Sequence, residues 1–331
     1  MPEIAAGPPL RVDAPARARV GPPAFDRPVP AGGYQWWYLD ALDPTGERGV
    51  VVIAFVGSVF SPYYHLARGR GRPDAENYCA VNVGLYRPSG KAWCMTERRR
   101  GSITREATQF RVGPSSLRWE AGELVVDLCE RCMPFGQRLR GQVRARPVLT
   151  SALDLELDGV GRHRWTPWAP LARVQVELTE PGVSWQGSGY LDSNRGDEPL
   201  EAAFASWNWS RVEDSGVVDV HYELSGRDGS QKQLAMRFDA NGHSQIPKGR
   251  RFDLPGSLWG VPRRARADAP ARLARTLEDT PFYARSLLAV DRAGGPALGV
   301  HEALSLQRFR RSWVRAMLPF RMPREWPASG S

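Results

Sequence analysis

The chain has no hydrophobic run long enough to cross a membrane. Its 331 residues are 42% hydrophobic, yet no apolar stretch approaches the roughly 20 residues that a spanning helix needs. The N-terminus also lacks a basic segment followed by an apolar one, the pattern of a secretory signal peptide. We therefore expect a cytoplasmic protein that meets a membrane, if at all, from the surface.

Residues typical of metal, redox and nucleotide sites are scarce. The CxxC spacing of Cys129 and Cys132 has no second pair, which a zinc ribbon would need. No two of the five histidines have the spacing of a ligand pair on one element. No glycine-rich phosphate loop and no nucleophile elbow is present. The sequence thus predicts no metal and reduced thiols at the four cysteines, Cys79, Cys94, Cys129 and Cys132.

Acidic residues are fewer than basic ones, 36 against 45, and the net charge is +9. No compact basic run interleaved with stacking aromatics occurs early in the chain, so we expect no nucleic-acid partner. The densest basic stretch is Leu306–Arg324, in which Phe309, Trp313 and Met317 have helical spacing. Pro319 should end this helix near Leu318. Its apolar face either docks on the rest of the protein or attaches to an anionic membrane surface.

Period-two alternation is the dominant pattern, and long helical patterns are nearly absent. Residues 117–128 alternate around Ala121-Gly122 and predict a hairpin. Residues 218–224 and 234–238 alternate on either side of an Asp228-Gly229 turn, and Asn241-Gly242 marks the next turn. The many glycines and prolines suit short strands and turns. The predicted fold class is all-β, a barrel or a sandwich.

A short repeat suggests two domains. Tyr38-Leu39-Asp40 and Tyr190-Leu191-Asp192 each lie before an apolar strand. We read them as the opening hairpins of two tandem β domains, at residues 31–180 and 181–331. Residues 1–30 are rich in Pro, Ala, Gly and Arg without periodicity, which predicts a flexible leader.

Three pairs of residues, each two positions apart, form a candidate site. Residues two apart on a strand share a face, so three neighbouring strands can line one pocket. Asp192 is the one carboxyl of this set, and aromatic walls would desolvate it and raise its pKa. Aromatic faces also stabilise a cation by ~1–2 kcal/mol each. This combination suits protonation of a carbon–carbon double bond, although plain strand packing and a turn-capping Asp192 are the alternatives. The pairs are His163 with Trp165, Tyr190 with Asp192, and Trp207 with Trp209.

Several segments resemble the carotenoid 1,2-hydratase (hydroxyneurosporene synthase) family of purple photosynthetic bacteria. The likeness runs from about residue 30 onward. It is carried by Gln35–Tyr38, Gly187–Asn194, Gly196–Leu200, Trp207–Arg211 and Leu318–Pro323.

The resemblance implies two lipocalin-like β-barrel domains and a cofactor-free hydratase. Such an enzyme adds water to the terminal double bond of acyclic carotenoids such as neurosporene and lycopene. The residues that the family uses match His163, Trp165, Tyr190 and Asp192, with Asp192 as the acid. We expect Trp37, Trp207 and Trp209 to contact substrate, and the basic C-terminal segment to hold the protein at the inner membrane.

Two other functions stay open from the residues alone. A non-catalytic lipocalin-like carrier of hydrophobic ligands needs the pocket but not the acid. A glycosidase would fit the tryptophan content, but it needs a second carboxylate about 5–10 Å from Asp192. Asp197 and Glu198 are the nearest candidates in sequence.

Overall fold

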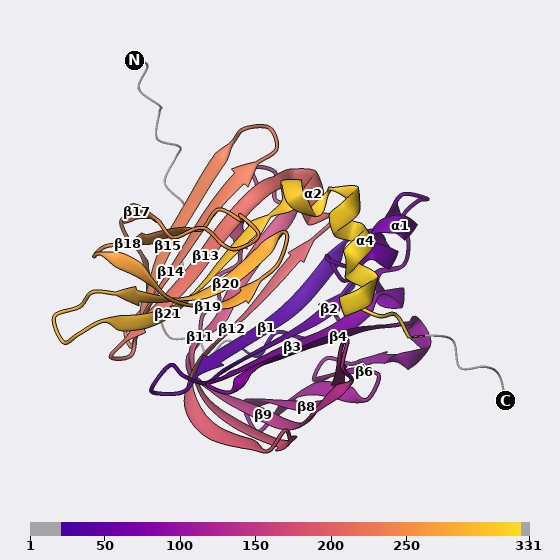
Figure 1. The fold of residues 1–331 in the computed structure, drawn as a ribbon, viewed down its shortest axis with the longest axis horizontal. Helices are drawn as coiled ribbons and strands as arrows, with labels where there is room; N and C mark the ends of the chain where they lie inside the picture. Colours follow the sequence, from indigo (N-terminus) through magenta and orange to yellow (C-terminus); the bar gives the residue numbers. More distant parts are fainter. Residues whose placement is uncertain (1–20, 326–331) are drawn as a thin grey trace.

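The computed structural model describes residues 21–325, and the predicted all-β class is confirmed. Twenty-one strands form a 12-stranded sheet, a seven-stranded sheet and a two-stranded ribbon (Figure 1). The first sheet contains β1 (Tyr34–Leu42), β2 (Gly49–Val56), β3 (Cys79–Arg87), β4 (Gly90–Arg98), β5 (Ile103–Arg105), β6 (Gln109–Val112), β7 (Ser115–Glu120), β8 (Glu123–Cys132), β9 (Gln137–Leu149), β10 (Leu155–Glu156), β11 (His163–Glu180) and β12 (Val183–Gly196).

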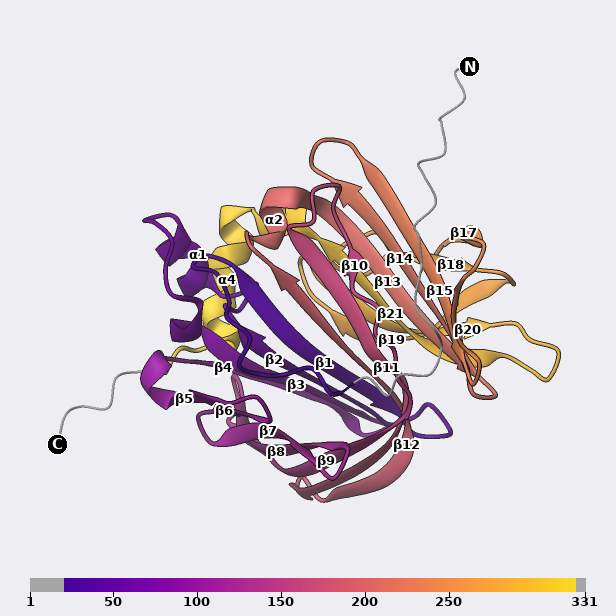
Figure 2. The ribbon, with the colours of Figure 1, turned by 180° about the vertical axis from the view of Figure 1, so that it is seen from behind.

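The second sheet is smaller and follows the first in sequence. Its strands are β13 (Phe204–Asp214), β14 (Val217–Gly226), β15 (Gln231–Asp239), β16 (Gly242–Gln245), β19 (Ala271–Asp279), β20 (Tyr283–Val290) and β21 (Ala297–Ser305); the ribbon pairs β17 (Arg250–Asp253) with β18 (Arg264–Ala267). Helices α1 (Pro62–Arg68), α2 (Leu200–Ala203) and α4 (Ser312–Arg321) gather at one end of the two sheets (Figure 2). A short α3 (Leu306–Phe309) leads into α4.

The first sheet curls into a nearly closed barrel, in which β4 contacts β8. Alternation decides which side chains fill it. Trp37 and Leu39 of β1 point inward to this barrel core, whereas Trp36 and Tyr38 point to the other face, where the two sheets pack together. The second sheet ends at β16 and β19, which are not paired with each other, so the described residues contain one near-closed barrel and one open sheet.

The predicted domain boundary at residue 180 falls inside the first sheet. β12 pairs with β1 along nine residues and with β11 on its other side, so residues 183–196 belong to the first unit. The change of sheet occurs at α2, just before β13. The boundary therefore moves from residue 180 to the region of Leu200–Ala203.

The structural meaning of the two Tyr-Leu-Asp segments differs from the prediction. The two copies are neighbouring strands of one sheet and do not open two domains. In the antiparallel pairing of β1 with β12, Tyr38 lies opposite Asp192, and Asp40 lies opposite Tyr190. The two motifs are thus related by a local two-fold axis between the strands, which sequence order alone does not reveal.

Part of the predicted leader is docked. Residues 1–20 lie outside the described part of the chain, but Phe25 is fully buried against Trp37 and Phe110. The indole nitrogens of Trp119 and Trp168 donate to the backbone carbonyls of Pro23 (3.0 Å) and Gly21 (3.0 Å). The flexible-leader prediction is therefore wrong for residues 21–30, because a buried aromatic side chain anchors them.

The basic C-terminal stretch forms two helices and not one. The backbone breaks between α3 and α4, so Phe309 is buried while Trp313 and Met317 are partly exposed. Pro319 lies inside the last turn of α4, which continues to Arg321. A proline this close to a C-terminus removes only one hydrogen bond of the final turn, so the helix runs past the predicted end.

The chain then returns to the edge of the first sheet. The backbone N–H of Glu97 in β4 donates to the carbonyl of Pro323 (2.9 Å), and that of Glu325 donates to the carbonyl of Glu97 (2.8 Å). The side chains of Arg324 and Glu97 form an ion pair. Residues 323–325 therefore tie the C-terminal helices to β4. Within residues 21–325, no helix combines the length and apolar composition needed to cross a membrane.

Candidate active site

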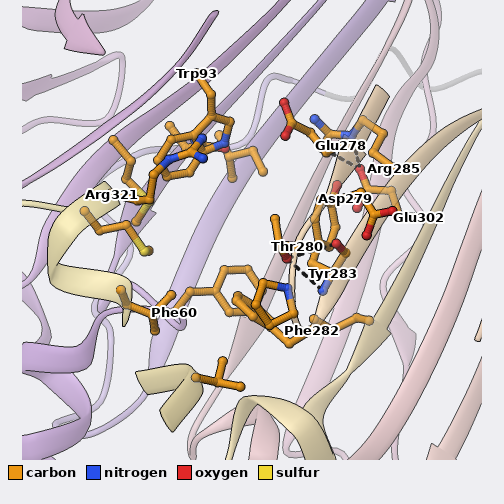
Figure 3. Close-up of a pocket in the computed structure, with 18 of the residues that line it drawn as sticks. Phe60, Trp93, Glu278, Asp279, Thr280, Phe282, Tyr283, Arg285, Glu302 and Arg321 are labelled. Atoms are coloured by element: carbon orange, nitrogen blue, oxygen red, sulfur yellow. Dashed lines mark hydrogen bonds and ion pairs between the residues drawn. The ribbon is translucent and has the colours of Figure 1, made fainter. Parts of the chain in front are cut away.

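A cavity of about 300 Å³ lies between the two sheets, beneath α4 (Figure 3). Its walls are mainly apolar and aromatic, and its size and lining are typical of a site for a hydrophobic small molecule. The lining comes from three parts of the chain. The first sheet and its connections contribute Trp36, Phe55, Phe60 and Trp93, the second unit contributes Trp207 and Phe282, and α4 contributes Val314 and Leu318.

Polar groups are concentrated in one part of this cavity. Oε1 of Glu302 accepts hydrogen bonds from Nε and Nη2 of Arg285 (3.1 and 2.6 Å). The hydroxyl of Tyr38 lies 2.9 Å from the same oxygen and 2.9 Å from Oδ2 of Asp40. The hydroxyl has one hydrogen, so it donates to only one of these carboxyl groups at a time. Tyr38 thus links the cavity wall to the buried polar layer behind it.

Asp192 lies in that layer, beneath a cluster of aromatic rings. Its Oδ2 accepts from Nε1 of Trp165 (2.8 Å) and from the hydroxyl of Tyr190 (2.9 Å). Its Oδ1 has no hydrogen-bond partner among the described residues. The ring of Trp209 packs on Tyr190 with centroids 5.3 Å apart, and Tyr222 packs on Trp165 at 5.0 Å. Asp192, Trp165 and Tyr190, which the sequence predicted together, are therefore in direct contact.

The surroundings of Asp192 favour its neutral form. Burial raises the pKa of Asp192 to about 8, while the hydrogen bonds from Trp165 and Tyr190 act in the opposite direction. None of the described arginines, lysines or histidines forms an ion pair with this carboxyl, although thirty-one such pairs occur elsewhere in the fold. Near neutral pH the group can therefore hold a proton in an apolar, aromatic site.

The second copy of the motif provides a comparison within the same sheet. The Tyr38 hydroxyl contacts Asp40 just as that of Tyr190 contacts Asp192. Asp40, however, is paired with the buried guanidinium of Arg211, whose Nε donates to Oδ1 at 2.7 Å. Asp40 and Arg211 therefore form a buried ion pair between the two sheets. Arg211 thus gives the carboxyl of Asp40 a cationic partner, which the carboxyl of Asp192 lacks among the described residues.

We expect the raised pKa of Asp192 to lower the stability of the folded state as the pH rises from about 4 to about 8. The folded protein keeps this proton over that range, whereas an unfolded aspartate with the ordinary pKa of 3.8 loses it. Asp192→Asn has no such proton. Its stability advantage over the wild type should therefore grow by ~3–4 kcal/mol between about pH 5 and about pH 8. Urea unfolding at both pH values measures this difference, and a constant difference would contradict the raised pKa.

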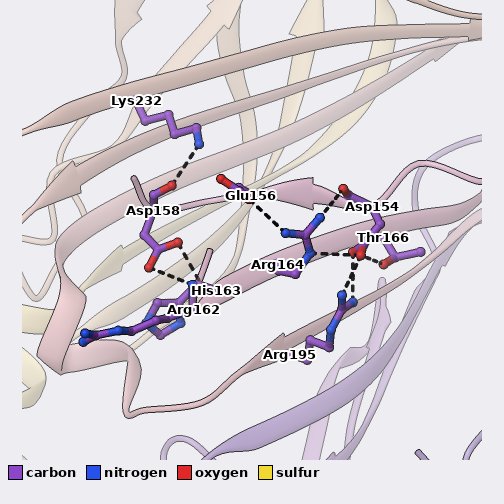
Figure 4. A network of polar contacts seen from close by, with 9 residues as sticks. All are labelled: Asp154, Glu156, Asp158, Arg162, His163, Arg164, Thr166, Arg195 and Lys232. Atoms are coloured by element: carbon purple, nitrogen blue, oxygen red, sulfur yellow. Dashed lines mark hydrogen bonds and ion pairs between the residues drawn. The ribbon is translucent and has the colours of Figure 1, made fainter. Parts of the chain in front are cut away.

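His163 has no contact with the Asp192 carboxyl, and its partners are Tyr34, Asp158 and Glu198. It lies beside Asp158 at the start of β11 (Figure 4). Its ring is fully buried, its Nδ1 is 2.9 Å from the Tyr34 hydroxyl, and its Nε2 lies 3.5 Å from Oε1 of Glu198. Burial lowers the pKa of His163, although Asp158 and Glu198 act to raise it. The backbone N–H of His163 also donates to Asp158 (3.3 Å). Its contacts therefore hold the start of β11 in place and do not reach Asp192.

The predicted substrate-contacting tryptophans occupy three different environments. Trp207 lines the cavity. Trp209 does not line it, and packs between Tyr38, Tyr190 and Tyr222. Trp37 points into the barrel core on the opposite face of β1, because neighbouring residues of a strand alternate. Trp37 therefore does not line the cavity, whereas its neighbour Trp36 does.

Sequence reasoning missed several residues that shape the cavity. Trp36 and Tyr38 lie two apart, so the same rule that paired Tyr190 with Asp192 indicates that they share a face. Glu302, Arg285 and Phe282 come from strands or turns far away in sequence, and no local pattern marks them. Within residues 21–325, no group of three or more His, Cys, Asp or Glu residues is placed to hold a metal ion.

Comparison with known proteins gives matches along most of the chain. Residues 52–329 match the family model described as carotenoid hydratase CrtC. An acyclic carotenoid 1,2-hydratase of Thiocapsa roseopersicina is 47% identical over 306 residues, covering 91% of this chain and 76% of the relative. One of Rubrivivax gelatinosus is 45% identical over 311 residues, covering 92% and 76%. One of Cereibacter sphaeroides is 36% identical, covering 82% and 98%.

Solved structures share the fold at low sequence identity. A protein of Nitrosomonas europaea assigned to AttH superposes with a TM-score of 0.61 at 17% identity, covering 84% of this chain and 93% of that one. Kievitone hydratase of Nectria haematococca superposes with a TM-score of 0.52 at 12% identity, covering 84% and 90%. These two matches support the fold alone, whereas the family model and the sequence relatives show that the chain belongs to the carotenoid hydratase family CrtC.

Proposed function

We propose that this protein adds water to the terminal 1,2 double bond of acyclic carotenoids such as neurosporene and lycopene, with Asp192 as the acid. The observation that carries the proposal is a buried aspartate with a raised pKa, no cationic partner and one free carboxyl oxygen. An alkene is weakly basic, so its protonation needs an uncharged acid in a dry site.

The hydrogen bonds suggest which oxygen carries the proton. Trp165 and Tyr190 both donate to Oδ2 of Asp192, which makes that oxygen the acceptor. The acidic proton is then on Oδ1, which has no described partner to receive it. An acid held in this way presents its proton to a substrate that has no hydrogen-bonding group.

The reaction needs no redox step. The Oδ1 proton forms a bond to carbon 2 of the alkene, and the tertiary cation at carbon 1 is stabilised by the aromatic faces around Asp192. A water oxygen then bonds to carbon 1, and one water proton passes to the Asp192 carboxylate, which restores the acid. His163 is not within hydrogen-bonding contact of Asp192, so Asp192 is favoured as the final base. The balance is one alkene plus one water, without a cofactor.

Substrate must reach Asp192 past Tyr38. Asp192 does not line the cavity, whereas Tyr38 does, and its ring contacts Tyr190 at 6.2 Å between centroids. The rings of Tyr38 and Trp209 pack edge to face with centroids 5.6 Å apart, so in the proposed complex they separate to admit the carotenoid end. Displacing the Tyr38 hydroxyl from its carboxyl partner costs about 0.5–1.5 kcal/mol, the usual net contribution of one hydrogen bond. Apolar contacts along the cavity can supply this energy.

We expect hydration to fall on the alkaline side, through about pH 8, because only the protonated form of Asp192 can act as the acid. Above that pH the rate should drop about tenfold per pH unit. Rates on detergent-dispersed lycopene between about pH 6 and pH 10 measure the profile, with circular dichroism at each pH to confirm folding. A rate that stays flat through about pH 10 while the protein remains folded would contradict an Asp192 acid.

The function itself is tested in a lycopene-producing bacterial host. Expression of this chain should increase the mass of the carotenoid by one water and create a tertiary alcohol. A non-catalytic carrier would bind lycopene and change its absorption spectrum without any change in mass. If purified protein binds lycopene but no hydrated product appears in the host or in vitro, the carrier explanation replaces the hydratase.

A further inference from the structure

The mouth of the cavity carries large apolar side chains that face solvent. Leu258 is 98% exposed and Phe320 is 75% exposed, while Trp259, Trp313 and Met317 are between 42% and 46% exposed. These five residues, here called the mouth rim, come from two segments that meet, since the rings of Trp259 and Trp313 stack with centroids 6.3 Å apart. An exposed apolar cluster of this kind marks an interaction site.

The loop that carries Leu258 and Trp259 is fixed with its apolar side chains outward. The backbone N–H of Leu258 donates to Oδ2 of Asp279 (2.6 Å), and that of Trp259 lies 3.5 Å from Oδ1. The backbone of the loop tip is thus attached to the end of β19, and no apolar side chain among residues 21–325 covers Leu258.

Helix α4 divides its apolar residues between two sides. Val314 and Leu318 are buried and line the cavity. Trp313, Met317 and Phe320 have the i, i+4, i+7 spacing of a second stripe, which is exposed. The helix therefore docks on the protein by one side and presents its other apolar side to solvent. Docking on the rest of the protein, one of the two alternatives that the sequence left open, is confirmed for one face of α4, and attachment to a membrane stays a prediction.

Positive charge surrounds the exposed stripe. The segment Leu306–Arg324 contains six arginines and no acidic residue. Arg310 and Arg311, at the junction of α3 and α4, are both exposed and form no ion pair with any described residue. Exposed apolar residues beside unpaired arginines match the surface of an anionic bilayer, which offers hydrocarbon and negative headgroups together.

The mouth rim is continuous with the cavity. Trp259 and Met317 are partly exposed and also line the cavity wall. A hydrophobic molecule can therefore pass from the surface covered by the rim to the interior along largely apolar contacts. A second copy of this chain is a poorer occupant, because a two-fold contact through the rim would bring the unpaired arginines of both copies together.

We propose that the mouth rim binds the surface of an anionic lipid bilayer, with Leu258 and Phe320 in the acyl region and Arg310 and Arg311 at the headgroups. The bilayer then faces the cavity entrance directly. This binding does not depend on hydration activity, so it can be tested without substrate and independently of the proposed reaction.

Flotation of the full chain with vesicles tests the proposal. We expect the protein to float with vesicles of phosphatidylcholine and phosphatidylglycerol in equal parts, and much less with phosphatidylcholine alone. The variant L258D/F320D should bind the anionic vesicles at least about tenfold more weakly. F135D/V160D is the matched control, since Phe135 (88%) and Val160 (71%) are exposed apolar residues outside the rim and should float as the wild type.

Two further arms separate the sources of binding. R310E/R311E should lose preference for the anionic vesicles, because it removes the headgroup contacts.

L258D/F320D should keep wild-type hydration of detergent-dispersed lycopene, since neither residue lines the cavity. The same variant should lose hydration of lycopene that is embedded in vesicles. Wild-type protein that fails to float, or L258D/F320D that floats as well as the wild type, would overturn the proposal. A dimer that L258D/F320D dissociates, without vesicle binding, would assign the rim to a second copy.

Discussion

Asp192→Asn should reduce hydration of lycopene by about 10²–10⁴-fold, the usual contribution of a general acid. Asparagine has the shape of a protonated aspartate, so its oxygen can still accept from Trp165 and Tyr190 while its amide replaces the Oδ1–H group. The variant loses the transferable proton and keeps the cavity. The measurement is the initial rate of product formation, with lycopene affinity from fluorescence quenching as a second readout.

The matched control is Asn194→Asp, which places an additional carboxyl on the same strand without restoring an acid at residue 192. Asn194 donates to the Tyr222 hydroxyl at 3.4 Å, so it borders the same aromatic cluster. In the double variant D192N/N194D activity should stay low, because the position of the acid matters and not only its presence. Full activity of D192N alone would remove Asp192 from the proton-donor role.

Arg211→Met should lower the free energy of unfolding by about 3–5 kcal/mol, because it leaves the buried Asp40 carboxyl without its cation. Both side chains are almost fully buried, at 2% and 3% exposure, so solvent cannot replace the lost partner. The double variant R211M/D40N should recover much of the loss, since no uncompensated charge remains. Urea unfolding measures all three proteins.

Arg272→Met is the control for a surface pair. Arg272 lies 2.7 Å from Asp291, but the two side chains are 59% and 52% exposed, so the change should cost less than about 1 kcal/mol. If R211M is no more destabilised than R272M, the Asp40–Arg211 pair does not hold the sheets together. The comparison separates the effect of burial from the effect of charge pairing.

Local patterns in the sequence predicted the chemistry of single strands well. Alternation placed Tyr190 and Asp192 on one face, and the turn at Ala121-Gly122 forms the expected hairpin between β7 and β8 with both residues at positive φ. The resemblance to carotenoid hydratases was confirmed by the family match. These features depend on neighbouring residues, so a single sequence contains the information.

Contacts between strands that are distant in sequence could not be predicted from local patterns. The partner of Asp40 is Arg211, 171 residues away, and nothing near either residue identifies the other. The same limit applies to the two Tyr-Leu-Asp motifs, which were predicted to open two domains. Their antiparallel pairing in one sheet is set by the tertiary fold, so the local sequence does not reveal it. The position of Trp37 was beyond prediction for a related reason, since the face that each residue of β1 occupies depends on which side of the strand meets the second sheet.

The tie between residues 323–325 and β4 has a consequence for how the protein is made. Glu97 is synthesised more than two hundred residues before the segment that pairs with its backbone, and α4 is also needed to cover the cavity. On the ribosome, the first barrel can form early, but its β4 edge and the aromatic cavity stay open until the last helix has emerged. The aromatic face of the first sheet therefore stays uncovered until the second sheet has been synthesised, and the cavity between the sheets stays open until α4 follows. Holding chaperones have this interval in which to protect the apolar surfaces.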